Sequence, residues 1–382
     1  MNRSKIAIFT HYYPFPVVRG DQLIVFNRLK YLSKFNDVTC YYWTQVGTDL
    51  KSDDELENVK FIKVGRGWHQ FWKSVFYILF KDAPLQSLGL FTILSEYEIS
   101  NFDHVIAYTV KFVWLLDFLP KEKLIFELID CLSSSFSSRS SVSKYFLTKK
   151  IYLIESKRLK IAENLVTSSG VGCSAVSSRD QEILGKNVFV SPNGVECRAV
   201  GISSVGIISF IGNMTYLPNV DAINFFIPCF QIIKEKYPFL KLYIVGYGAS
   251  RLDQSIVKEP GVCVFDNVPS VTTYLSKSLF SIAPMRVANG VQNKILEAGA
   301  CGVPIICSTA AACGVKSNIK RHLNIAHDDS IESFSELCSI YIDSPELAFI
   351  QGSNLRNAIC KSISWDTVNI EFYNEFLNKN ND

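Results

Sequence analysis

Short apolar runs alternate with amphipathic segments along almost the whole chain. Residues 21–34 place Leu23, Phe26, Leu29 and Leu32 three residues apart, which predicts a helix. Runs rich in β-branched and aromatic residues predict strands, and they occur at residues 5–10, 38–43, 104–108, 124–128, 188–190, 206–211, 240–245, 279–283 and 303–307. Because continuous apolar strands separated by helices are typical of parallel sheets covered on both faces, the pattern predicts an α/β fold.

A turn sequence divides the chain into two series of strand–helix units. Ser191-Pro192-Asn193-Gly194 combines the residues that most strongly favour turns. We therefore predict two Rossmann-like domains, residues 1–187 and 188–362, which suits the size of ordinary domains in a chain of 382 residues. Residues 363–382 are expected to form a C-terminal helix that crosses back to the N-terminal domain, because Val368, Phe372 and Phe376 are four residues apart.

The composition excludes several classes of protein. Hydrophobic residues make up 48% and charged residues 20% of the chain, which is typical of a globular protein and argues against disorder. A net charge of +3 without a concentrated basic stripe argues against nucleic-acid binding. No uncharged apolar stretch approaches the roughly 20 residues needed to span a bilayer, and the first apolar run is too short for a signal peptide. We therefore expect a cytoplasmic protein.

The eleven cysteines are odd in number and scattered, and no two have C-x-x-C spacing. This arrangement argues against a disulfide framework or a zinc site. We therefore predict buried free thiols in a reducing cytosol. The acidic pairs at 53–54 and 328–329 are expected to be solvated, and no D-x-D triplet occurs, so no metal site is predicted.

Residues 284–298 have the features of an anion-binding loop. They read Pro-Met-Arg-Val-Ala-Asn-Gly-Val-Gln-Asn-Lys-Ile-Leu-Glu-Ala and follow a predicted strand directly. A glycine-containing loop that enters a helix presents free N–H groups and the positive end of the helix dipole, which suits a diphosphate. Lys294 would bind a phosphate there, and Glu297, one turn further on, could reach a ribose hydroxyl. The alternative is an ordinary loop with a solvated lysine and glutamate.

This loop resembles the donor site of family-4 glycosyltransferases, especially the sugar transferases of exopolysaccharide and O-antigen clusters with their G-[IV]-Q-N-K-[IV]-L-E-A motif. Other segments resemble the family in the same order along the chain. They are His-Tyr-Tyr-Pro-Phe-Pro at 11–16, Ser-Pro-Asn-Gly-Val-Glu at 191–196, Phe-Ile-Gly-Asn-Met-Thr-Tyr-Leu-Pro-Asn-Val-Asp-Ala at 210–222 and Ile-Val-Gly-Tyr-Gly at 244–248. The resemblance covers nearly the whole chain. It implies the GT-B fold, in which two Rossmann-like domains face each other across a cleft.

The resemblance also implies roles for individual residues. Donor-binding residues would be Gly20, Asp21, Gly212, Asn213, Arg286, Gly290, Val291, Gln292, Asn293, Lys294 and Glu297. Gly20 and Asp21 would also approach the acceptor. Asp130, His11 and Asn289 are the candidate catalytic residues, and the first two follow predicted strands, at the sheet edge where α/β proteins bind ligands. A helix cap is the alternative role for Asp130, and a packed core histidine is the alternative for His11.

Two positions depart from the family pattern. Asn289 stands where many members have the first glutamate of a Glu-x7-Glu pair, and Asn213 stands where a basic residue commonly follows the glycine. Asn289 can still bind a hydroxyl, and Arg286 and Lys294 are the available cations.

The resemblance implies retaining transfer of a hexose-type sugar, without a metal or other cofactor, in surface polysaccharide synthesis. The donor would be a nucleotide-diphosphate sugar and the acceptor a saccharide, free or lipid-linked. A nucleotide-sugar 2-epimerase of the same fold and a non-catalytic partner in polysaccharide assembly are the alternatives. A nicotinamide enzyme is disfavoured, because Gly246-Tyr247-Gly248 does not extend to a full G-x-G-x-x-G.

Two segments mix aromatic and aliphatic residues with lysine and arginine, at 68–81 and 144–160. This mixture favours a helix that lies in a membrane interface. We therefore predict peripheral contact with the inner face of the cytoplasmic membrane. The alternative is that these side chains pack in the core and the lysines are solvated.

Overall fold

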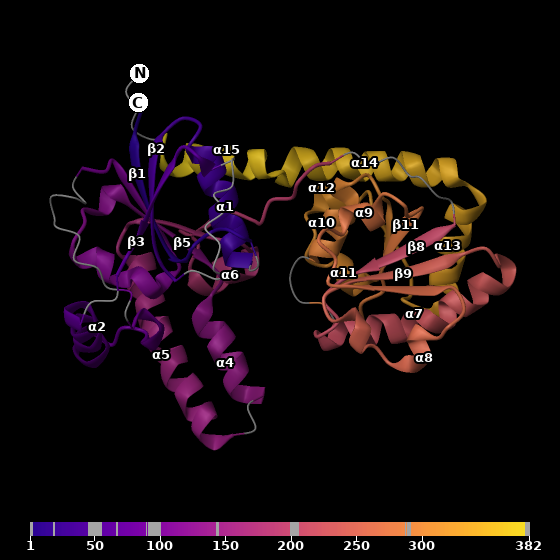
Figure 1. Ribbon diagram of the computed structural model, residues 1–382, viewed down its shortest axis with the longest axis horizontal. Helices are drawn as coiled ribbons and strands as arrows, with labels where there is room; N and C mark the ends of the chain where they lie inside the picture. The colour runs from indigo at the N-terminus through magenta and orange to yellow at the C-terminus, as the bar shows by residue number, and fades with distance from the viewer. Residues whose placement is uncertain are drawn as a thin grey trace. The chain divides into compact units, whose positions relative to one another are not determined.

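The computed structural model describes residues 3–17, 20–44, 56–65, 68–88, 90, 101–142, 145–198, 206–286, 288 and 292–378 (Figure 1). The chain divides into two compact units. The first, unit 1, comprises Met1–Asn193 and Val368–Asp382, and the second, unit 2, comprises Gly194–Thr367. The first crossing between the units falls within the turn sequence at 191–194.

Unit 1 is built on a seven-stranded parallel sheet with the order β3-β2-β1-β4-β5-β6-β7. In β1, the consecutive residues Ile6, Ala7, Ile8 and Phe9 are all buried. Successive side chains point to opposite faces, so both faces of this sheet are covered, as the apolar runs predict. The strands are β1 (Lys5–Tyr12), β2 (Asp37–Thr44), β3 (Val59–Lys63), β4 (His104–Tyr108), β5 (Leu124–Ile129), β6 (Gly172–Ala175) and β7 (Phe189–Val190).

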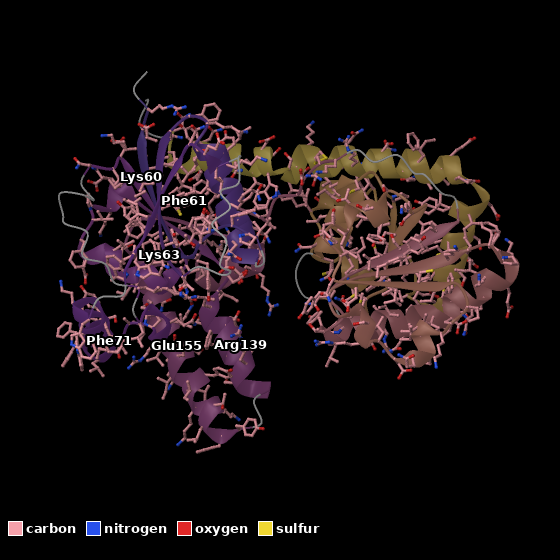
Figure 2. The ribbon with its side chains drawn as sticks, viewed as in Figure 1. Lys60, Phe61, Lys63, Phe71, Arg139 and Glu155 are labelled. Atoms are coloured by element: carbon pink, nitrogen blue, oxygen red, sulfur yellow. A yellow bond between two sulfur atoms is a disulfide. The ribbon has the colours of Figure 1, made fainter. Side chains whose placement is uncertain are left out.

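Helices cover this sheet, and two of them form a long hairpin that projects from it, α4 beside α5 (Figure 1). The edge strand β3 carries the exposed residues Lys60 and Lys63 (Figure 2), a common protection of sheet edges. The helices of unit 1 are α1 (Gly20–Leu32), α2 (Trp68–Phe80), α4 (Leu132–Val142), α5 (Phe146–Ser168) and α6 (Ser178–Leu184), with short 3-10 helices at Leu85–Ser87, Val110–Asp117 and Lys121–Lys123.

The C-terminal helix α15 (Trp365–Phe376) is bound into unit 1 from Val368 onward, which confirms the predicted return of the chain. Its anchor is the buried side chain of Arg28. The guanidinium donates hydrogen bonds to Glu127 at 2.7 Å and to Asn369 at 2.6 Å, and it stacks 3.7 Å from the centre of the Phe372 ring. Nη2, which donates to Glu127, also donates to Ser191 Oγ at 3.1 Å. The sequence gives no sign of this cluster, because Arg28 occupies an ordinary helical position.

Unit 2 has a six-stranded parallel sheet with the order β10-β9-β8-β11-β12-β13. Its strands are β8 (Ile207–Ile211), β9 (Lys241–Gly246), β10 (Val262–Asp266), β11 (Phe280–Ala283), β12 (Ile305–Cys307) and β13 (Asn324–Ile325). Its helices are α7 (Leu217–Lys236), α8 (Gln254–Val257), α9 (Thr272–Leu275), α10 (Asn293–Ala300), α11 (Thr309–Ala312), α12 (Ser317–Lys320), α13 (Ile331–Asp343) and α14 (Pro345–Ile363), with a 3-10 helix at Ala249–Arg251.

Both sheets reverse their strand order next to their first strand, as doubly wound nucleotide-binding folds do. The reversal lies between β1 and β4 in unit 1 and between β8 and β11 in unit 2. Loops at the carboxyl ends of those strands diverge and leave room for a ligand. The topology therefore predicts that a ligand would bind at the carboxyl edge of either sheet.

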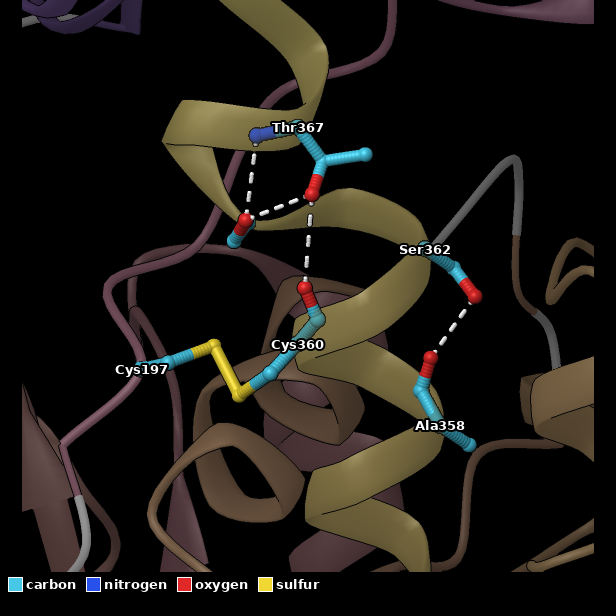
Figure 3. Close-up of a disulfide and its surroundings, with 6 residues drawn as sticks. Cys197, Ala358, Cys360, Ser362 and Thr367 are labelled. Atoms are coloured by element: carbon cyan, nitrogen blue, oxygen red, sulfur yellow. Dashed lines mark hydrogen bonds between the residues drawn. A yellow bond between two sulfur atoms is a disulfide. The ribbon is translucent and has the colours of Figure 1, made fainter.

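One prediction about the cysteines is wrong. Cys197 and Cys360 form a disulfide although 163 residues separate them (Figure 3). The Val195 N–H donates to the Ile363 carbonyl at 2.9 Å, which holds the two segments side by side. Sequence spacing could not reveal a pair that only the tertiary fold brings together. The other nine cysteines are free thiols, and seven of them are buried, whereas Cys263 is half-buried and Cys313 is exposed.

Candidate functional site

The candidate donor site lies at the carboxyl ends of β8 and β11 in unit 2. The β8 strand runs into the loop that begins at Gly212, and β11 runs into the loop before α10. Asn289, Gly290 and Val291, which we predicted as site residues, lie outside the described residues. The other predicted donor residues of unit 2 are Gly212, Asn213, Arg286, Gln292, Asn293, Lys294 and Glu297, and all of them lie in these two loops or in α10, whereas Gly20 and Asp21 begin α1 in unit 1.

Lys294 is buried in the first turn of α10, with only 7% of its surface exposed. Its ammonium donates to Asn219 Oδ1 at 2.6 Å and lies 4.5 Å from the centre of the Phe210 ring. Burial lowers the pKa of Lys294 to about 8, although the charge of Glu297 opposes that change. The alternative of a solvated lysine is therefore wrong. A buried cation with a neutral hydrogen-bond partner is poised to gain from an arriving anion.

Asn219, in the first turn of α7, connects Lys294 to the β8 loop. Its amide nitrogen donates to the Asn213 carbonyl at 2.8 Å while its oxygen accepts from Lys294. A Cβ at Gly212 would lie 2.8 Å from that amide nitrogen, so only glycine leaves room for the contact. Sequence reasoning missed Asn219 as a site residue. Its place in the Pro-Asn-x-Asp part of the family-like segment was the available signal.

Asn213 uses its side chain locally. Its Oδ1 accepts hydrogen bonds from the Thr215 N–H at 2.9 Å and from the Thr215 hydroxyl at 2.7 Å. This turn stabilises the β8 loop. Gly246 at the end of β9 has φ +143°, and a Cβ there would collide with the Gly212 carbonyl at 2.0 Å, so two glycines allow the neighbouring loops to approach closely.

Arg286, at the start of the loop after β11, is paired with Asp221 on α7. Arg286 Nε donates to Asp221 Oδ2 at 2.9 Å, and Nη2 donates to Oδ1 of the same carboxylate. The hydrogen bonds from Arg286 lower the pKa of Asp221. The charge of Arg286 is thus already balanced, whereas Lys294 faces an amide.

Glu297 lies three residues after Lys294 in α10. Burial raises the pKa of Glu297 to about 6, and the charge of Lys294 opposes this rise. A solvated surface glutamate is therefore excluded here as well. Gln292 precedes the helix as its N-cap residue and Asn293 is its first residue, so both lie at the N-terminus of α10, the positive end of the helix dipole.

The corresponding edge of unit 1 has a different chemistry. His11 is near the end of β1, half-buried and stacked on Tyr12 with the ring centres 4.3 Å apart. Asp130 follows β5 directly, and Gly20 and Asp21 begin α1. Asp130 is exposed as a residue, yet partial desolvation of its carboxyl raises its pKa, and the charges of Asp180 and Asp21 raise it further. Three carboxylates therefore gather near this edge.

The backbone of this edge is strained. Ile129, the last residue of β5, has φ +65°, and Thr109, directly after β4, has φ +73°. Left-handed conformations are rare for β-branched residues and concentrate at functional sites. Glu163, rather than Asp130, accepts the Ser133 N–H in the first turn of α4, at 2.9 Å.

The described residues contain no group of three or more His, Cys, Asp or Glu side chains that could hold a metal ion. Within the same parts of the chain, no helix is both long and apolar enough to cross a membrane.

Similarity to known proteins identifies the fold of the chain. Residues 206–343, which span most of unit 2, match the family model described as glycosyl transferases group 1. A glycosyltransferase from Rickettsia africae has 15% identity and a TM-score of 0.65, with 100% of both chains covered. The chain has the GT-B fold. Two further structures with the GT-B fold are similar: sucrose-phosphate synthase from Thermosynechococcus elongatus and HepE from Anabaena, which was solved in complex with UDP-glucose. Each is 13% identical to this chain with a TM-score of 0.63, and each match covers 97% of this chain and 98% of the other protein's chain. A search of curated protein sequences finds no match.

The GT-B fold confirms the predicted fold class. The family match over residues 206–343 supports glycosyl transfer as the class of activity. The matched segment contains every described donor residue that we predicted in unit 2.

Proposed function

We propose that this GT-B protein is a glycosyltransferase that moves a hexose-type sugar from a nucleotide-diphosphate donor to a saccharide acceptor, free or lipid-linked, in surface polysaccharide synthesis. The observation that carries the proposal is the buried ammonium of Lys294 at the strand-order reversal of unit 2. A cation with a lowered pKa at a helix N-terminus fits a diphosphate, because anions are stabilised there. The HepE structure contains UDP-glucose, which supports the donor class.

In this proposal, protein groups bind both the diphosphate and the ribose of the nucleotide-sugar donor. The N–H groups at the start of α10 and Lys294 bind the diphosphate, and Glu297 accepts hydrogen bonds from the ribose. Arg286 contributes only if it leaves Asp221, so we assign it the smaller share. In unit 1, we assign His11, Asp21 and Asp130 to binding the hydroxyls of the acceptor.

The transfer is proposed to retain the anomeric configuration. The bond between the anomeric carbon and the β-phosphate oxygen breaks, and the acceptor oxygen bonds to that carbon on the same face. The acceptor proton passes to the departing phosphate. Lys294 and the α10 N–H groups stabilise the negative charge that develops on the leaving group, and such preorganised donors commonly make the largest contribution to catalysis. The reaction as proposed needs no metal, so activity should survive EDTA.

We also propose peripheral contact with the inner face of the cytoplasmic membrane. The side chains of Trp68, Trp72 and Phe76 on α2 are 77%, 53% and 52% exposed, so the alternative of core packing is wrong for them. Segments 68–81 and 132–162 contain one carboxylate, Glu155. Glu155 is buried and accepts the Leu85 and Gln86 N–H groups at 2.8 and 3.1 Å (Figure 2). Exposed aromatic groups among lysines suit an anionic surface.

The test of the activity is a ligand screen followed by a transfer assay. UDP-, GDP- and dTDP-sugars are each added to the protein, and a bound donor should raise the melting temperature, because a ligand that binds only the folded state stabilises it. The stabilising donor is then incubated with and without saccharide acceptors. Conversion of the donor sugar without an acceptor would identify a 2-epimerase. Absence of stabilisation by any nucleotide sugar would favour the non-catalytic partner.

A further inference from the structure

The turn that follows Asp130 is held by two carboxylates from different helices. The Cys131 N–H donates to Asp180 Oδ1 at 3.0 Å. Two residues further on, Ser133 donates its N–H to Glu163 at 2.9 Å and its hydroxyl to the same carboxylate at 2.5 Å. Asp180 belongs to α6 and Glu163 to α5. Both helices therefore determine where this turn lies.

The strand before the turn needs such support. The pairing of β5 with β6 shifts register between Glu127 and Ile129, and Ile129 has φ +65°. A β-branched residue persists in this conformation only where the surrounding structure over-determines it. The Ile129 carbonyl accepts the Val176 N–H at 2.9 Å. Together with the Asp180 contact, this bond fixes the backbone on both sides of Asp130.

Hydrogen bonds to Ser177 hold the side chain of Asp180 in place. The Ser177 hydroxyl donates to Asp180 Oδ2 at 2.5 Å, and the Asp180 N–H donates back to Ser177 Oγ at 3.1 Å. Ser177 is the N-cap residue of α6. This reciprocal pair leaves the other carboxylate oxygen directed at Cys131.

We propose that Asp180 is a positioning residue that holds the Asp130 carboxyl at the carboxyl edge of the unit 1 sheet. The role of Asp130 in transfer rests on the proposed function. Asp180 acts through one hydrogen bond to the backbone next to Asp130 and through its charge. Glu163 supports the same turn two residues away, which makes it a matched comparison.

The charged groups around Asp130 divide between three helices. Asp21 begins α1, Asp180 lies in α6 and Glu163 lies in α5. Desolvation raises the pKa of Asp130 most, and the charges of Asp180 and Asp21 raise it further. Removal of the Asp180 charge should therefore lower the Asp130 pKa, and the acid limb of the activity profile should move to lower pH.

The experiment compares Asp180→Asn, Asp180→Ala, Glu163→Gln and Asp130→Asn in the full chain, with the nucleotide sugar that the wild-type protein transfers. Asp180→Asn keeps an acceptor for the Cys131 N–H and removes the charge, whereas Asp180→Ala removes both. We expect kcat of Asp180→Ala to fall roughly 10- to 100-fold with the donor KM unchanged, because a small misplacement of a reacting group can cost about that much. Asp180→Asn should recover most of that loss and still show the shifted acid limb. Melting curves identify any variant that fails to fold, and the Asp180→Asn profile then carries the test alone.

Glu163→Gln should lose stability without moving the acid limb. An equal movement of that limb in Glu163→Gln, or an unchanged kcat and limb in Asp180→Ala, would overturn the role of Asp180. Full activity of Asp130→Asn would overturn the role of Asp130 and with it this inference, while transfer by the wild-type protein would still support the proposed function.

Discussion

Among the described residues, the buried arginine of unit 1, Arg28, and the buried lysine of unit 2, Lys294, have opposite surroundings. In unit 1, burial alone would lower the pKa of Arg28, but Glu127 and Tyr108 raise it above its ordinary value. Arg28 also binds Ser191 and Asn369, so its charge and its donors are satisfied within the protein. In unit 2, Lys294 binds the neutral Asn219, and burial lowers its pKa to about 8.

This difference separates a structural charge from one prepared for a ligand. A buried charge with a full set of partners holds elements together, here α1, β5 and α15. A buried charge that is hydrogen-bonded to a neutral group and only partly offset by a nearby carboxylate, as Lys294 is by Glu297, is destabilising for the free protein, and an arriving anion would offset that cost. Burial by itself therefore does not distinguish the two roles, whereas the chemistry of the partners does.

The largest expected effect is on stability in unit 1. Arg28→Ala leaves Glu127 buried without its counterion, and breaking a buried ion pair costs about 3–5 kcal/mol. The free energy of unfolding, measured by urea denaturation, should fall by that amount. Lys236→Ala, which removes an ion pair with Asp343 whose two side chains are both exposed, is the control and should have no measurable effect. A loss as small as that of the control would show that Arg28 does not anchor α15.

The next effect is on catalysis in unit 2. Lys294→Ala should lower kcat roughly 100- to 1,000-fold, the range found when one preorganised donor to a developing charge is removed. Its unfolding free energy should change far less than that of Arg28→Ala, because no ion pair is broken. Arg286→Ala should be the milder variant, since Asp221 already balances that charge. A worse kcat for Arg286→Ala would assign the diphosphate to the other cation.

The contrast between the two cations also explains what the sequence could predict. Strands and helices were predictable because each depends on neighbours within a few residues, and the same local pattern singled out Lys294 as a candidate. Arg28, Glu127 and Asn369 are far apart in sequence, and nothing in their local context marks them as partners. The same holds for Cys197 with Cys360 and for the contact of Asn219 with Lys294. Local sequence patterns therefore single out candidate site residues more readily than the contacts that support them.

A smaller effect is expected on donor affinity. Glu297, with a pKa of about 6, is protonated below that pH and then accepts fewer hydrogen bonds, while Lys294 loses its charge above about pH 8. The affinity for UDP, measured by calorimetry, should therefore be highest between these values. Glu297→Gln should remove the acid limb and weaken binding at pH 7 at least tenfold, because hydrogen bonds to a charged group contribute about 1.5–3 kcal/mol. Glu336→Gln, on the surface of α13, is the control. Unchanged affinity in Glu297→Gln would rule out its contact with the ribose.

The smallest effect per residue is expected at the membrane. Each lysine near an anionic surface contributes about 1 kcal/mol, so the contributions of Lys73, Lys81, Lys149 and Lys150 only matter together with the exposed aromatic groups of α2. The protein should sediment with vesicles of phosphatidylglycerol and phosphatidylcholine at low ionic strength and be largely released at high salt, which screens the charges.

The double variant Trp72→Ser, Phe76→Ser separates membrane contact from packing. Both side chains are more than half exposed, so their removal should weaken vesicle binding while the melting temperature barely moves. Phe35→Ser removes an equally exposed aromatic group, 56% exposed, from the turn between α1 and β2 and should leave vesicle binding intact. If instead the double variant lost several kcal/mol of stability, as buried aromatic truncations do at about 3–5 kcal/mol each, these side chains would pack against the protein in solution. Absence of vesicle binding by the unaltered protein at every salt concentration would end the membrane proposal and leave a soluble acceptor.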